Sequence, residues 1–491
     1  MAITARLERY QSVALIALPC VWAAIVLSPG FATDADSYYH VGVARRLVED
    51  GWLRSFEWLP HTTLADPYPN TAFGQHLVLA PLVALLGGDL ALRAGILLLS
   101  TAFAVSVYLV LRRRGVRWPA PWIVLGLLGC PLAVSYSTFL KGASTFLVLL
   151  PWFVDAVWAG STRRTFVLTW VSVYVYVGAT VLVPFVIVHV LAVRAVEGRW
   201  SLGVLGAVLA GLIAGMVLNP LWPAHWSYVV AELRTIFERD PALIPGEYRG
   251  AEWAILGTDM LVRLAAPALV AWVVVVARRF AATPAVTASA ASSSIAAFGL
   301  LAGGLLSGTK LVELFLVFSL LALPQLVEQL TWPRGVKVAS ITLALAGVVS
   351  SLLLRADMLQ SPTLTRPRDY EAMGRWLAER TSDGEMVVAP WDDMPGLFMY
   401  GGDAHFMAGY NVQFLRDHDR VRFDAYALFY RGLISDPEQT MIQFFDGARL
   451  VLVRRLARSP GDERLAATLG ANRAFEELAS PNTTWRVWRR R

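Results

Sequence analysis

The apolar segment SVALIALPCVWAAIVL, at residues 12–27, is followed seven residues later by DADSYYH at residues 34–40. Two carboxylates, Asp34 and Asp36, therefore stand at the mouth of a segment long enough to enter a membrane, with two tyrosines and a histidine beside them. Charged groups are costly at a bilayer, so acids clustered there indicate a functional use. No small-residue cleavage site follows the apolar segment, and we expect an uncleaved first membrane span rather than a signal peptide.

The composition predicts a polytopic α-helical membrane protein. The chain has 491 residues, of which 56% are hydrophobic and 16% are charged, whereas a soluble protein has about 25% charged residues. Several apolar runs approach the ~20 residues that cross a bilayer. The net charge of +6 comes with arginine clusters between these runs, which orient membrane helices, so we expect no nucleic-acid partner. Cys20 and Cys130 lie in apolar segments and are expected to pack as small hydrophobic residues.

Arginine-rich loops mark the cytoplasmic side and fix the predicted topology. Arg6 and Arg9 place the N-terminus inside, so the long loop at residues 29–75 is outside. Residues 76–86 are apolar but short for a span, and we expect an interfacial or re-entrant helix there. The second span, at residues 89–111, then ends inside at the arginines of residues 112–114. Counting residues 76–86 as a full span would place this arginine cluster outside.

The same rule gives about eleven transmembrane helices. The later spans are expected at residues 119–134, 142–159, two within 166–193, 202–218, one ending at 278–279, one ending near 308, 311–327 and 338–354. A second long outer loop is expected at residues 219–257, and an inner linker rich in Ala, Ser and Thr at residues 281–294.

The tail has a different composition from the rest of the chain, because it is richer in charge. We expect strands at residues 386–389, 449–453 and 485–488, and helices at residues 370–380 and 462–478. The predicted division is a transmembrane domain at residues 1–354 and a small extracytoplasmic α/β domain at residues 355–491.

Asp34 and Asp36 are the first candidate catalytic residues. In an extended loop, residues two apart point to the same side, so both carboxylates could converge on one cation or one reacting hydroxyl. Two neighbouring carboxylates also raise one another's proton affinity, which suits a general base. The alternative is that Asp36 caps a helix beginning near Tyr38.

Three basic residues are candidates for binding an anionic lipid headgroup at the outer rim. Lys141 lies between the third and fourth spans, Lys310 between the ninth and tenth, and Arg93 near the start of the second. A cation in this low-dielectric region would pair strongly with a phosphate. The alternatives are a structural Lys310–Glu313 pair, or lysines that extend to the lipid headgroups.

The first outer loop also contains four residues that could ligate a metal ion: His40, His61, His76 and Asp66. Their spacing matches no known ligand signature, and interfacial histidines are the alternative interpretation. In the tail, Trp391-Asp392-Asp393 follows a predicted strand, where an α/β sheet commonly contacts ligands and where helix N-caps are equally common. No phosphate loop, nucleophile elbow or paired-cysteine motif occurs, so the energy for any reaction must come from the substrate.

Several of these segments resemble the GT-C glycosyltransferases, a family of integral membrane enzymes. The resembling segments are residues 34–40, the short helix from His76, Ala91-Leu92-Arg93-Ala94-Gly95 leading to the arginines at 112–114, the turn from Ser135 to Lys141, and Lys310-Leu311-Val312-Glu313. The family includes protein O-mannosyltransferases, lipid A aminoarabinose transferases and the catalytic subunits of oligosaccharyltransferases. Trp391-Asp392-Asp393 is loosely similar to the Trp-Trp-Asp acceptor motif of the last group, but it lacks the doubled Trp.

The resemblance implies transfer of a sugar from a polyprenyl-phosphate-linked donor to a lipid, glycan or protein acceptor on the outer face of a bacterial-type plasma membrane. Asp36, or Asp34, would take the acceptor proton, and Asp36 is also the candidate ligand of a divalent cation, Mg²⁺ or Mn²⁺. Lys310, Lys141 and Arg93 would neutralise the departing phosphate. Four further residues would support the acceptor: His40, Tyr39, Trp391 and Asp392.

Two other classes of function, a transporter and a non-catalytic scaffold, are alternatives to a glycosyltransferase. A lipid or sugar transporter, or a flippase without transferase chemistry, usually places its charged residues near the membrane midplane, whereas the charges here gather at one rim. A non-catalytic scaffold would use its outer domain to bind a partner and its acids as helix caps.

Overall fold

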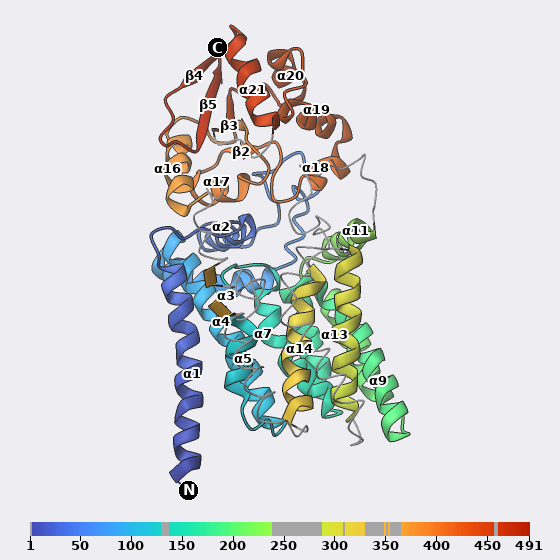
Figure 1. The fold of residues 1–491 in the computed structure, drawn as a ribbon. Coiled ribbons are helices and arrows are strands. Elements are labelled where there is room, and N and C mark those ends of the chain that lie inside the picture. The colour runs from blue at the N-terminus through green and yellow to red at the C-terminus, as the bar shows by residue number, and fades with distance from the viewer. Residues whose placement is uncertain are drawn as a thin grey trace. The chain divides into compact units, whose positions relative to one another are not determined.

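The computed structural model describes residues 2–128, 137–237, 287–307, 310–328, 348–349, 352–353, 365–455 and 460–491 of the 491-residue chain (Figure 1). The chain divides into two compact units. Unit 1 comprises Met1–Ser28, Thr71–Gln75 and Ile96–Met358, and unit 2 comprises Pro29–Asn70, His76–Gly95 and Leu359–Arg491. Residues 29–70, which form most of the expected first outer loop, therefore belong to the same unit as the tail.

Unit 1 is built from helices. In chain order its elements are α1 (Ala2–Val26), most of α4 (Gly88–Arg113), α5 (Pro119–Leu128), α7 (Ala143–Trp158), α8 (Thr162–Val175), the 3₁₀ turn η1 (Val177–Val181), α9 (Leu182–Glu197), α10 (Leu202–Val217), α11 (Ala224–Phe237), α13 (Ala288–Ser307) and α14 (Lys310–Glu328). The core is packed with aliphatic and aromatic side chains, and the rings of Phe185 and Phe318 lie 4.7 Å apart between α9 and α14.

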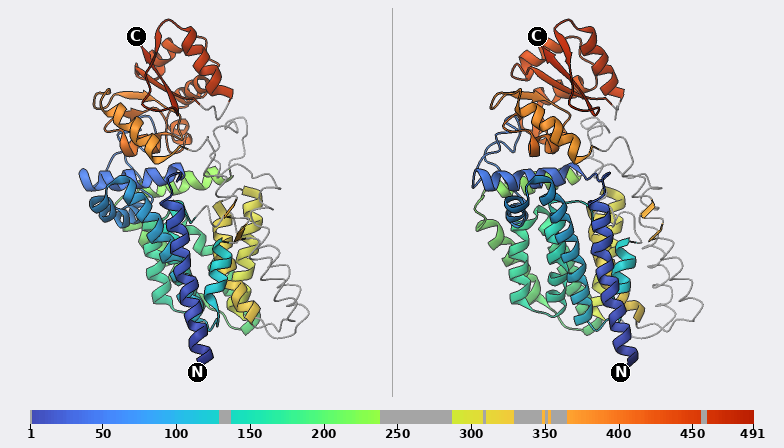
Figure 2. Two further views of the ribbon diagram at one scale, coloured as in Figure 1. Left: turned by 60° about the vertical axis from the view of Figure 1, so that its left-hand side comes forward. Right: turned by 90° about the vertical axis from the view of Figure 1, so that its left-hand side faces the viewer.

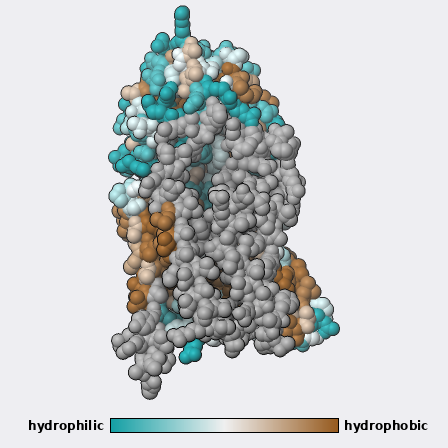
Figure 3. All heavy atoms as spheres, in the orientation of Figure 1, coloured by the Kyte–Doolittle hydropathy of each residue, from teal (hydrophilic) through white to brown (hydrophobic). Residues whose placement is uncertain are grey.

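Two of the described helical segments are long and apolar enough to cross a membrane, Gly88–Arg113 and Val177–Glu197. Shorter apolar helices include α5, α7 and α10. Large apolar side chains remain exposed on α9 and α10, among them Leu191 and Ile213, as expected for surfaces that face lipid. Figure 3 shows hydrophobic atoms on the flanks of the helical part and mainly hydrophilic atoms on the visible tail. The count of eleven spans stays a prediction.

A buried ion-pair cluster ties three helices of unit 1 together. Asp155 on α7 is 3% exposed. Its carboxylate accepts hydrogen bonds from Arg114, at 2.8 Å, and from Arg164 at the start of α8, at 2.7 Å. A buried carboxylate needs such partners, because removal from water is otherwise costly. Part of the arginine cluster after α4 therefore has a structural role in addition to the orienting role expected from the sequence.

Unit 2 combines helices with a five-stranded sheet (Figure 2). Its helices are α2 (Ala35–Glu49), most of α3 (Phe73–Leu86), α16 (Pro367–Ala378), α17 (Met394–Tyr400), α18 (Gln413–His418), α19 (Arg420–Tyr430), α20 (Pro437–Phe444) and α21 (Pro460–Ala471). Its strands are β1 (Met386–Val388), β2 (His405–Phe406), β3 (Leu450–Arg454), β4 (Phe475–Leu478) and β5 (Trp485–Arg490).

The sheet has the order β2-β1-β3-β5-β4. Strand β1 is parallel to β2 and β3, and β5 is antiparallel to β3 and β4. All residues of β1 and β3 are buried, which is typical of central strands covered on both faces. The three strands expected from the sequence are confirmed, and β2 and β4 are additional.

Helix α2 packs closely against α17, which brings the first outer loop onto the tail. A Cβ atom at Gly42 would lie 2.7 Å from the ring of Phe398, so only glycine allows this approach. Arg46 donates a hydrogen bond to the carbonyl oxygen of Gly402, pairs with Asp403 at 2.8 Å, and lies 4.5 Å from the ring of Trp58. These contacts make the loop an integral part of unit 2.

Three expectations about local structure are wrong. The linker expected at residues 281–294 is helical from Ala288, because alanine favours helix and the serine hydroxyls bond back to the preceding turn, as Ser294 does to Ala290. The helix expected at residues 462–478 ends at Ala471, and β4 follows. The segment at residues 34–36 is not an extended loop, since α2 begins at Ala35. The expected eighth span, and most of the eleventh, lie outside the described residues.

Candidate active site

Asp34 is the N-cap of α2. Its backbone is extended, and its carboxylate accepts hydrogen bonds from the backbone N–H of Ser37, at 3.2 Å, and from the Ser37 hydroxyl. The hydroxyl groups of Thr33 and Ser37 lie 2.9 Å apart, within hydrogen-bond distance, beside this cap. The first N–H groups of a helix lack intrahelical partners, and an aspartate oxygen satisfies one of them. Asp34 is therefore engaged in fixing the start of α2.

Asp36 lies in the first turn of α2 and is not the cap, so the alternative that it caps a helix near Tyr38 is wrong. It is half-buried, and its carboxylate makes no hydrogen bond or ion pair with any residue that the structure describes. Burial raises the pKa of the neighbouring Tyr39, and the charge of Asp36 raises it further. The helix N-terminus favours a negative charge at Asp36.

One turn further along α2, His40 begins a chain of buried hydrogen bonds. Its Nδ1 lies 2.8 Å from Nε2 of His76 on α3, and Nδ1 of His76 lies 2.7 Å from Oδ1 of Asn70. All three side chains are at most 4% exposed. Because an amide oxygen only accepts, His76 donates from Nδ1, and its Nε2 accepts from Nδ1–H of His40. This leaves Nε2 as the proton-accepting atom of His40. Burial and the neighbouring His40 lower the pKa of His76.

Tyrosines pack beside this chain. The Tyr39 hydroxyl lies 2.5 Å from that of Tyr68, and the Tyr39 ring stacks on Tyr410 with the ring centres 4.1 Å apart. Tyr410 has a φ of 60°, which is rare for a large side chain and recurs at functional sites. The tyrosines at 68 and 410 were not singled out from the sequence, because only the fold brings them to α2.

The four metal-ligand candidates of the first loop do not form one site. His40 and His76 bond to each other, whereas His61 bonds to Asp446 after α20. Asp66 is exposed. Within the part of the chain that the structure describes, no group of three or more His, Cys, Asp or Glu side chains could hold a metal ion.

The candidate phosphate-binding residues fall in both units. In unit 2, Arg93 donates from Nε to Asp89 at 2.9 Å and lies 5.0 Å from the ring of Phe31. In unit 1, Nζ of Lys141 lies 5.7 Å from the ring centre of Phe139. Lys310 is the first residue of α14, and its side chain lies outside the described residues. Convergence of these cations on Asp36 stays a prediction.

Unit 1 contains a small apolar cavity of roughly 60 Å³. It is lined by side chains of α4, α7 and α14, including Phe103, Leu147 and Leu320, and three serines, Ser100, Ser137 and Ser144, share its wall. The backbone N–H of Lys141 donates to the Ser144 hydroxyl at 2.9 Å, so one candidate phosphate-binding residue adjoins this cavity. At this volume the cavity is too small to hold a lipid chain, since ligand sites usually measure about 300–1,000 Å³.

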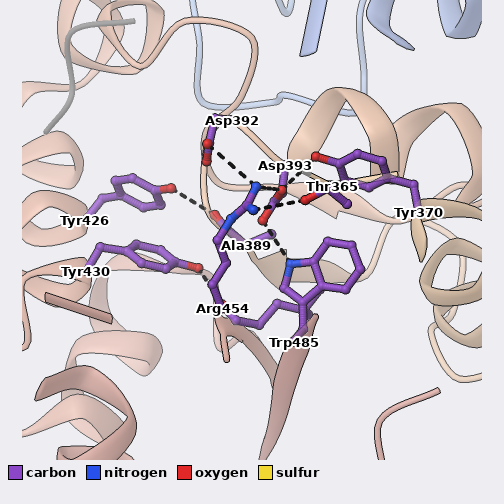
Figure 4. Close-up of polar contacts among 10 residues, drawn as sticks. Thr365, Tyr370, Ala389, Asp392, Asp393, Tyr426, Tyr430, Arg454 and Trp485 are labelled. Carbon is purple, nitrogen blue, oxygen red and sulfur yellow. Dashed lines mark hydrogen bonds and ion pairs between the residues drawn. The ribbon is translucent and has the colours of Figure 1, made fainter. Parts of the chain in front are cut away.

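Trp391-Asp392-Asp393 belongs in part to a buried structural network (Figure 4). Asp393 is fully buried, and its carboxylate accepts from Tyr370 at 2.8 Å, from the Trp485 indole at 2.9 Å, and from Arg454. It occupies the N-cap position of α17, but its side chain makes no cap hydrogen bond. Burial lowers the pKa of Arg454, but the carboxylates of Asp393 and Asp392 raise it more, so that it lies above its usual value.

Trp391 and Asp392 are only half-buried. The Asp392 carboxylate lies 3.7 Å from Arg454, at the edge of the network rather than inside it. These two residues are the partly exposed part of the motif, whereas Asp393 is buried within the network.

No protein-family profile and no curated protein sequence match the chain, but solved structures match its fold. The archaeal oligosaccharyltransferase AglB from Archaeoglobus fulgidus, in complex with an inhibitory peptide and a dolichol-phosphate, is 9% identical and covers 95% of this chain and 72% of its own, with a TM-score of 0.65. ArnT from Cupriavidus metallidurans, bound to undecaprenyl phosphate, is 13% identical and covers 97% of both chains, with a TM-score of 0.62.

A further structure of the A. fulgidus oligosaccharyltransferase, a complex with Zn and sulfate, is 11% identical and covers 90% of this chain and 68% of its own, with a TM-score of 0.55. At such identities the likeness establishes the fold alone. The resemblance expected from the sequence is thus confirmed at the level of fold. This chain shares with these neighbours a largely helical fold that also contains a small sheet.

Proposed function

We propose that this chain, which has the fold of the GT-C membrane glycosyltransferases, moves a sugar from a polyprenyl-phosphate-linked donor to an acceptor on the extracytoplasmic face. The observation that carries the proposal is the carboxylate of Asp36. It is half-buried at a helix start and forms no hydrogen bond or ion pair with the described residues. A carboxylate held in place but left without partners is available to a reacting group.

The structural neighbours support the class of donor. AglB is described in complex with a dolichol-phosphate and ArnT with undecaprenyl phosphate, and both lipids are polyprenyl phosphates. The acceptor is proposed as a lipid, glycan or protein, and the membrane as a bacterial-type plasma membrane with the N-terminus inside.

The proposed reaction needs only a base and a set of cations. The acceptor hydroxyl oxygen attacks the anomeric carbon of the sugar, and the bond from that carbon to the phosphate oxygen breaks. The hydroxyl proton passes to the carboxylate of Asp36. The polyprenyl phosphate leaves with one additional negative charge, which Lys310, Lys141 and Arg93 would neutralise. Asp34 is the weaker candidate base, because it would have to give up the cap of α2.

Tyr39 and His40 on α2 would support the acceptor. Asn70 and His76 fix the orientation of His40. Trp391 and Asp392 are the tail residues proposed to contact the acceptor, since both remain partly exposed.

A divalent cation, Mg²⁺ or Mn²⁺, is a further proposal for Asp36. The donor set of the described residues does not fit a complete site, since they gather no group of three or more metal-binding side chains. Mg²⁺ usually keeps several waters and is held by one or two carboxylates together with substrate phosphates, so Asp36 could supply only part of such a site. We therefore derive no step of the reaction through a metal.

The test is donor consumption. Purified protein is incubated with a panel of radiolabelled prenyl-phosphate sugars, and loss of the labelled donor is followed. Asp36→Asn is expected to lower the rate by at least about a hundredfold, because general-base catalysis contributes ~10²–10⁴. The matched control is Glu57→Gln, which neutralises an exposed carboxylate of the same loop and is expected to leave the rate unchanged.

Wild-type activity in Asp36→Asn would remove Asp36 as the base. If no donor is consumed but labelled lipid crosses the membrane of reconstituted vesicles, the transporter interpretation replaces the enzymatic one. Lys310→Ala is expected mainly to weaken use of the donor, and an unchanged dependence on donor concentration would return Lys310 to a structural role.

A further inference from the structure

Unit 2 contains a second cavity that the proposed reaction does not use. It has a volume of about 400 Å³, within the range of small-molecule sites. Its wall includes Glu385, which precedes β1, His405 of β2, Arg449, which precedes β3, and Arg490 at the end of β5. We call it the sheet-edge cavity. It lies at the amino-terminal ends of the parallel strands, whereas Trp391-Asp392-Asp393 follows the carboxyl-terminal end of β1.

The acidic groups in this wall already have arginine partners. Glu385 accepts two hydrogen bonds from Arg449, at 3.0 and 2.8 Å. Asp446 accepts from Arg422 at 2.8 Å and bonds to His61. Although partial burial raises the pKa of each carboxyl, these bonds lower it below its usual value. Both acids are thus ionised and paired with an arginine, and Arg422 is shared between Asp446 and Asp419, whose carboxylate lies 3.1 Å from Nε of Arg422.

Arg490 is the cation of the wall that lacks an acidic partner. One terminal nitrogen donates to the carbonyl oxygen of Gly447 at 2.8 Å, and Arg490 forms no ion pair with any residue that the structure describes. Its neighbours differ: Arg489 bonds to Glu476 at 2.6 Å, and Arg491 lies 3.7 Å from the same carboxylate. Since side chains alternate along a strand, Arg490 points to the opposite side from these two pairs.

His405 adds a neutral polar group to the same wall. Its imidazole forms no hydrogen bond with the described part of the chain, and burial lowers its pKa from 6.5. A neutral imidazole has one donor and one acceptor nitrogen, and a hydroxyl group can satisfy both. The cavity therefore offers the Arg490 guanidinium, which forms no ion pair with the described residues, beside a partner for hydroxyls.

We propose that the sheet-edge cavity binds a sugar acid, with its carboxylate on Arg490 and a hydroxyl on His405. Guanidinium groups match carboxylates in charge and shape. One guanidinium fits a carboxylate, which carries a single negative charge, better than a phosphate, which carries about 1.5 to 2. This site is separate from the Asp36 region and does not depend on the proposed transfer reaction.

The experiment measures binding of glucuronate to the purified full-length chain by microscale thermophoresis, with glucose and inorganic phosphate as comparison probes. We expect saturable binding of glucuronate, at least about tenfold tighter than that of glucose, because the carboxylate adds a charge-assisted hydrogen bond. Arg490→Gln is expected to weaken glucuronate binding at least about tenfold by the same reasoning. Arg489→Gln is the matched control, and it should bind as the wild type does.

Two further variants guard against a loss of binding through misfolding. Arg490→Lys keeps the charge and should retain part of the affinity. His405→Ala removes a side chain that forms no hydrogen bond with the described residues, and it should weaken binding of glucuronate more than binding of inorganic phosphate. Thermal unfolding of each variant monitors the fold. Asp36→Asn should bind glucuronate as the wild type does, which separates this site from the reaction.

Four results would overturn the proposal. They are no binding of glucuronate, equal binding of glucose and glucuronate, tighter binding of inorganic phosphate than of glucuronate, and equal loss of affinity in Arg489→Gln and Arg490→Gln.

Discussion

Two aspartates of one short segment have different roles because of the backbone around them. Asp34 has extended φ and ψ angles and caps α2, whereas Asp36 lies in the first helical turn and has no partner among the described residues. The residue type alone does not separate these roles. The cap holds α2 in place, and the fixed helix in turn presents the carboxylate of Asp36.

We expect Asp34→Ala to reduce stability by about 1 kcal/mol, the usual effect of losing a side-chain N-cap. Asp34→Ser should restore most of it, because a serine hydroxyl also caps. Asp36→Asn should leave stability unchanged. Thermal unfolding of the detergent-solubilised protein measures all three, and a wild-type melting temperature for Asp34→Ala would show that the cap does not limit stability.

Stability should also depend on pH through His76. Burial and His40 lower the pKa of His76 in the folded protein, whereas the unfolded chain has the ordinary value of about 6.5. Above that value His76 is neutral in both states. Below it, the unfolded state binds the proton first, so stability falls as the pH drops. The melting temperature should therefore decrease from pH 7.5 to pH 5.5.

The variant His76→Gln tests the origin of this pH dependence. It is expected to flatten the slope of melting temperature against pH, because the buried titratable group is gone. His418→Gln, which changes an exposed histidine, is the control and should keep the wild-type slope. A slope that is equally steep in His76→Gln would assign the pH dependence to other groups.

At the scale of elements, the Asp393 network joins parts of the tail that are distant in sequence. Tyr370 comes from α16, Arg454 from β3 and Trp485 from β5, and all three bond to the carboxylate that precedes α17. Arg454 also donates to Thr365 at 2.9 Å. The network thus fixes two helices against the centre of the sheet.

Removing one partner of this buried ion pair should be strongly destabilising. We expect Arg454→Met to cost about 3–5 kcal/mol, because it leaves the Asp393 carboxylate buried without its counter-charge. Arg375→Gln, which breaks an exposed pair with Glu371, should cost at most about 1 kcal/mol. Chemical denaturation compares the two variants, and equal losses would contradict a special role for the buried pair.

Sequence patterns predicted the elements whose signals are local. Helices α4, α7 and α10 and strands β1, β3 and β5 were expected within a few residues of their observed bounds. The helix expected at residues 462–478 is too long, because Phe475 and Leu478 of β4 have the three-residue spacing of a helix face and continue the pattern of α21. At the candidate site, Asp36 and His40 were found from sequence. Asn70 was not, since its role depends on a tertiary hydrogen bond to His76.

At the scale of the whole chain, the orientation of the two units across the membrane depends on tertiary contacts and on the distribution of charge. The grouping of the first outer loop with the tail rests on close contacts such as Arg46 with Asp403, and no local pattern of sequence predicts them. The predicted direction in which the chain crosses the membrane is based only on the positions of the arginine and lysine residues. If the positive-inside rule holds here, the loop and the tail are both outside, and their membership of one compact unit agrees with a location on the same side.

Cysteine labelling tests this orientation. In a Cys20→Ser, Cys130→Ser background, Asp383→Cys in the tail should react with a membrane-impermeant maleimide on intact cells, because residue 383 is exposed and expected outside. Arg199→Cys, in the exposed turn after α9, should react only after permeabilisation. Labelling of both sites from outside would contradict the predicted topology between them. Labelling of residue 199 alone would show that the chain has the opposite orientation. Asp36 would then lie on the cytoplasmic side, which would exclude the proposed extracytoplasmic reaction.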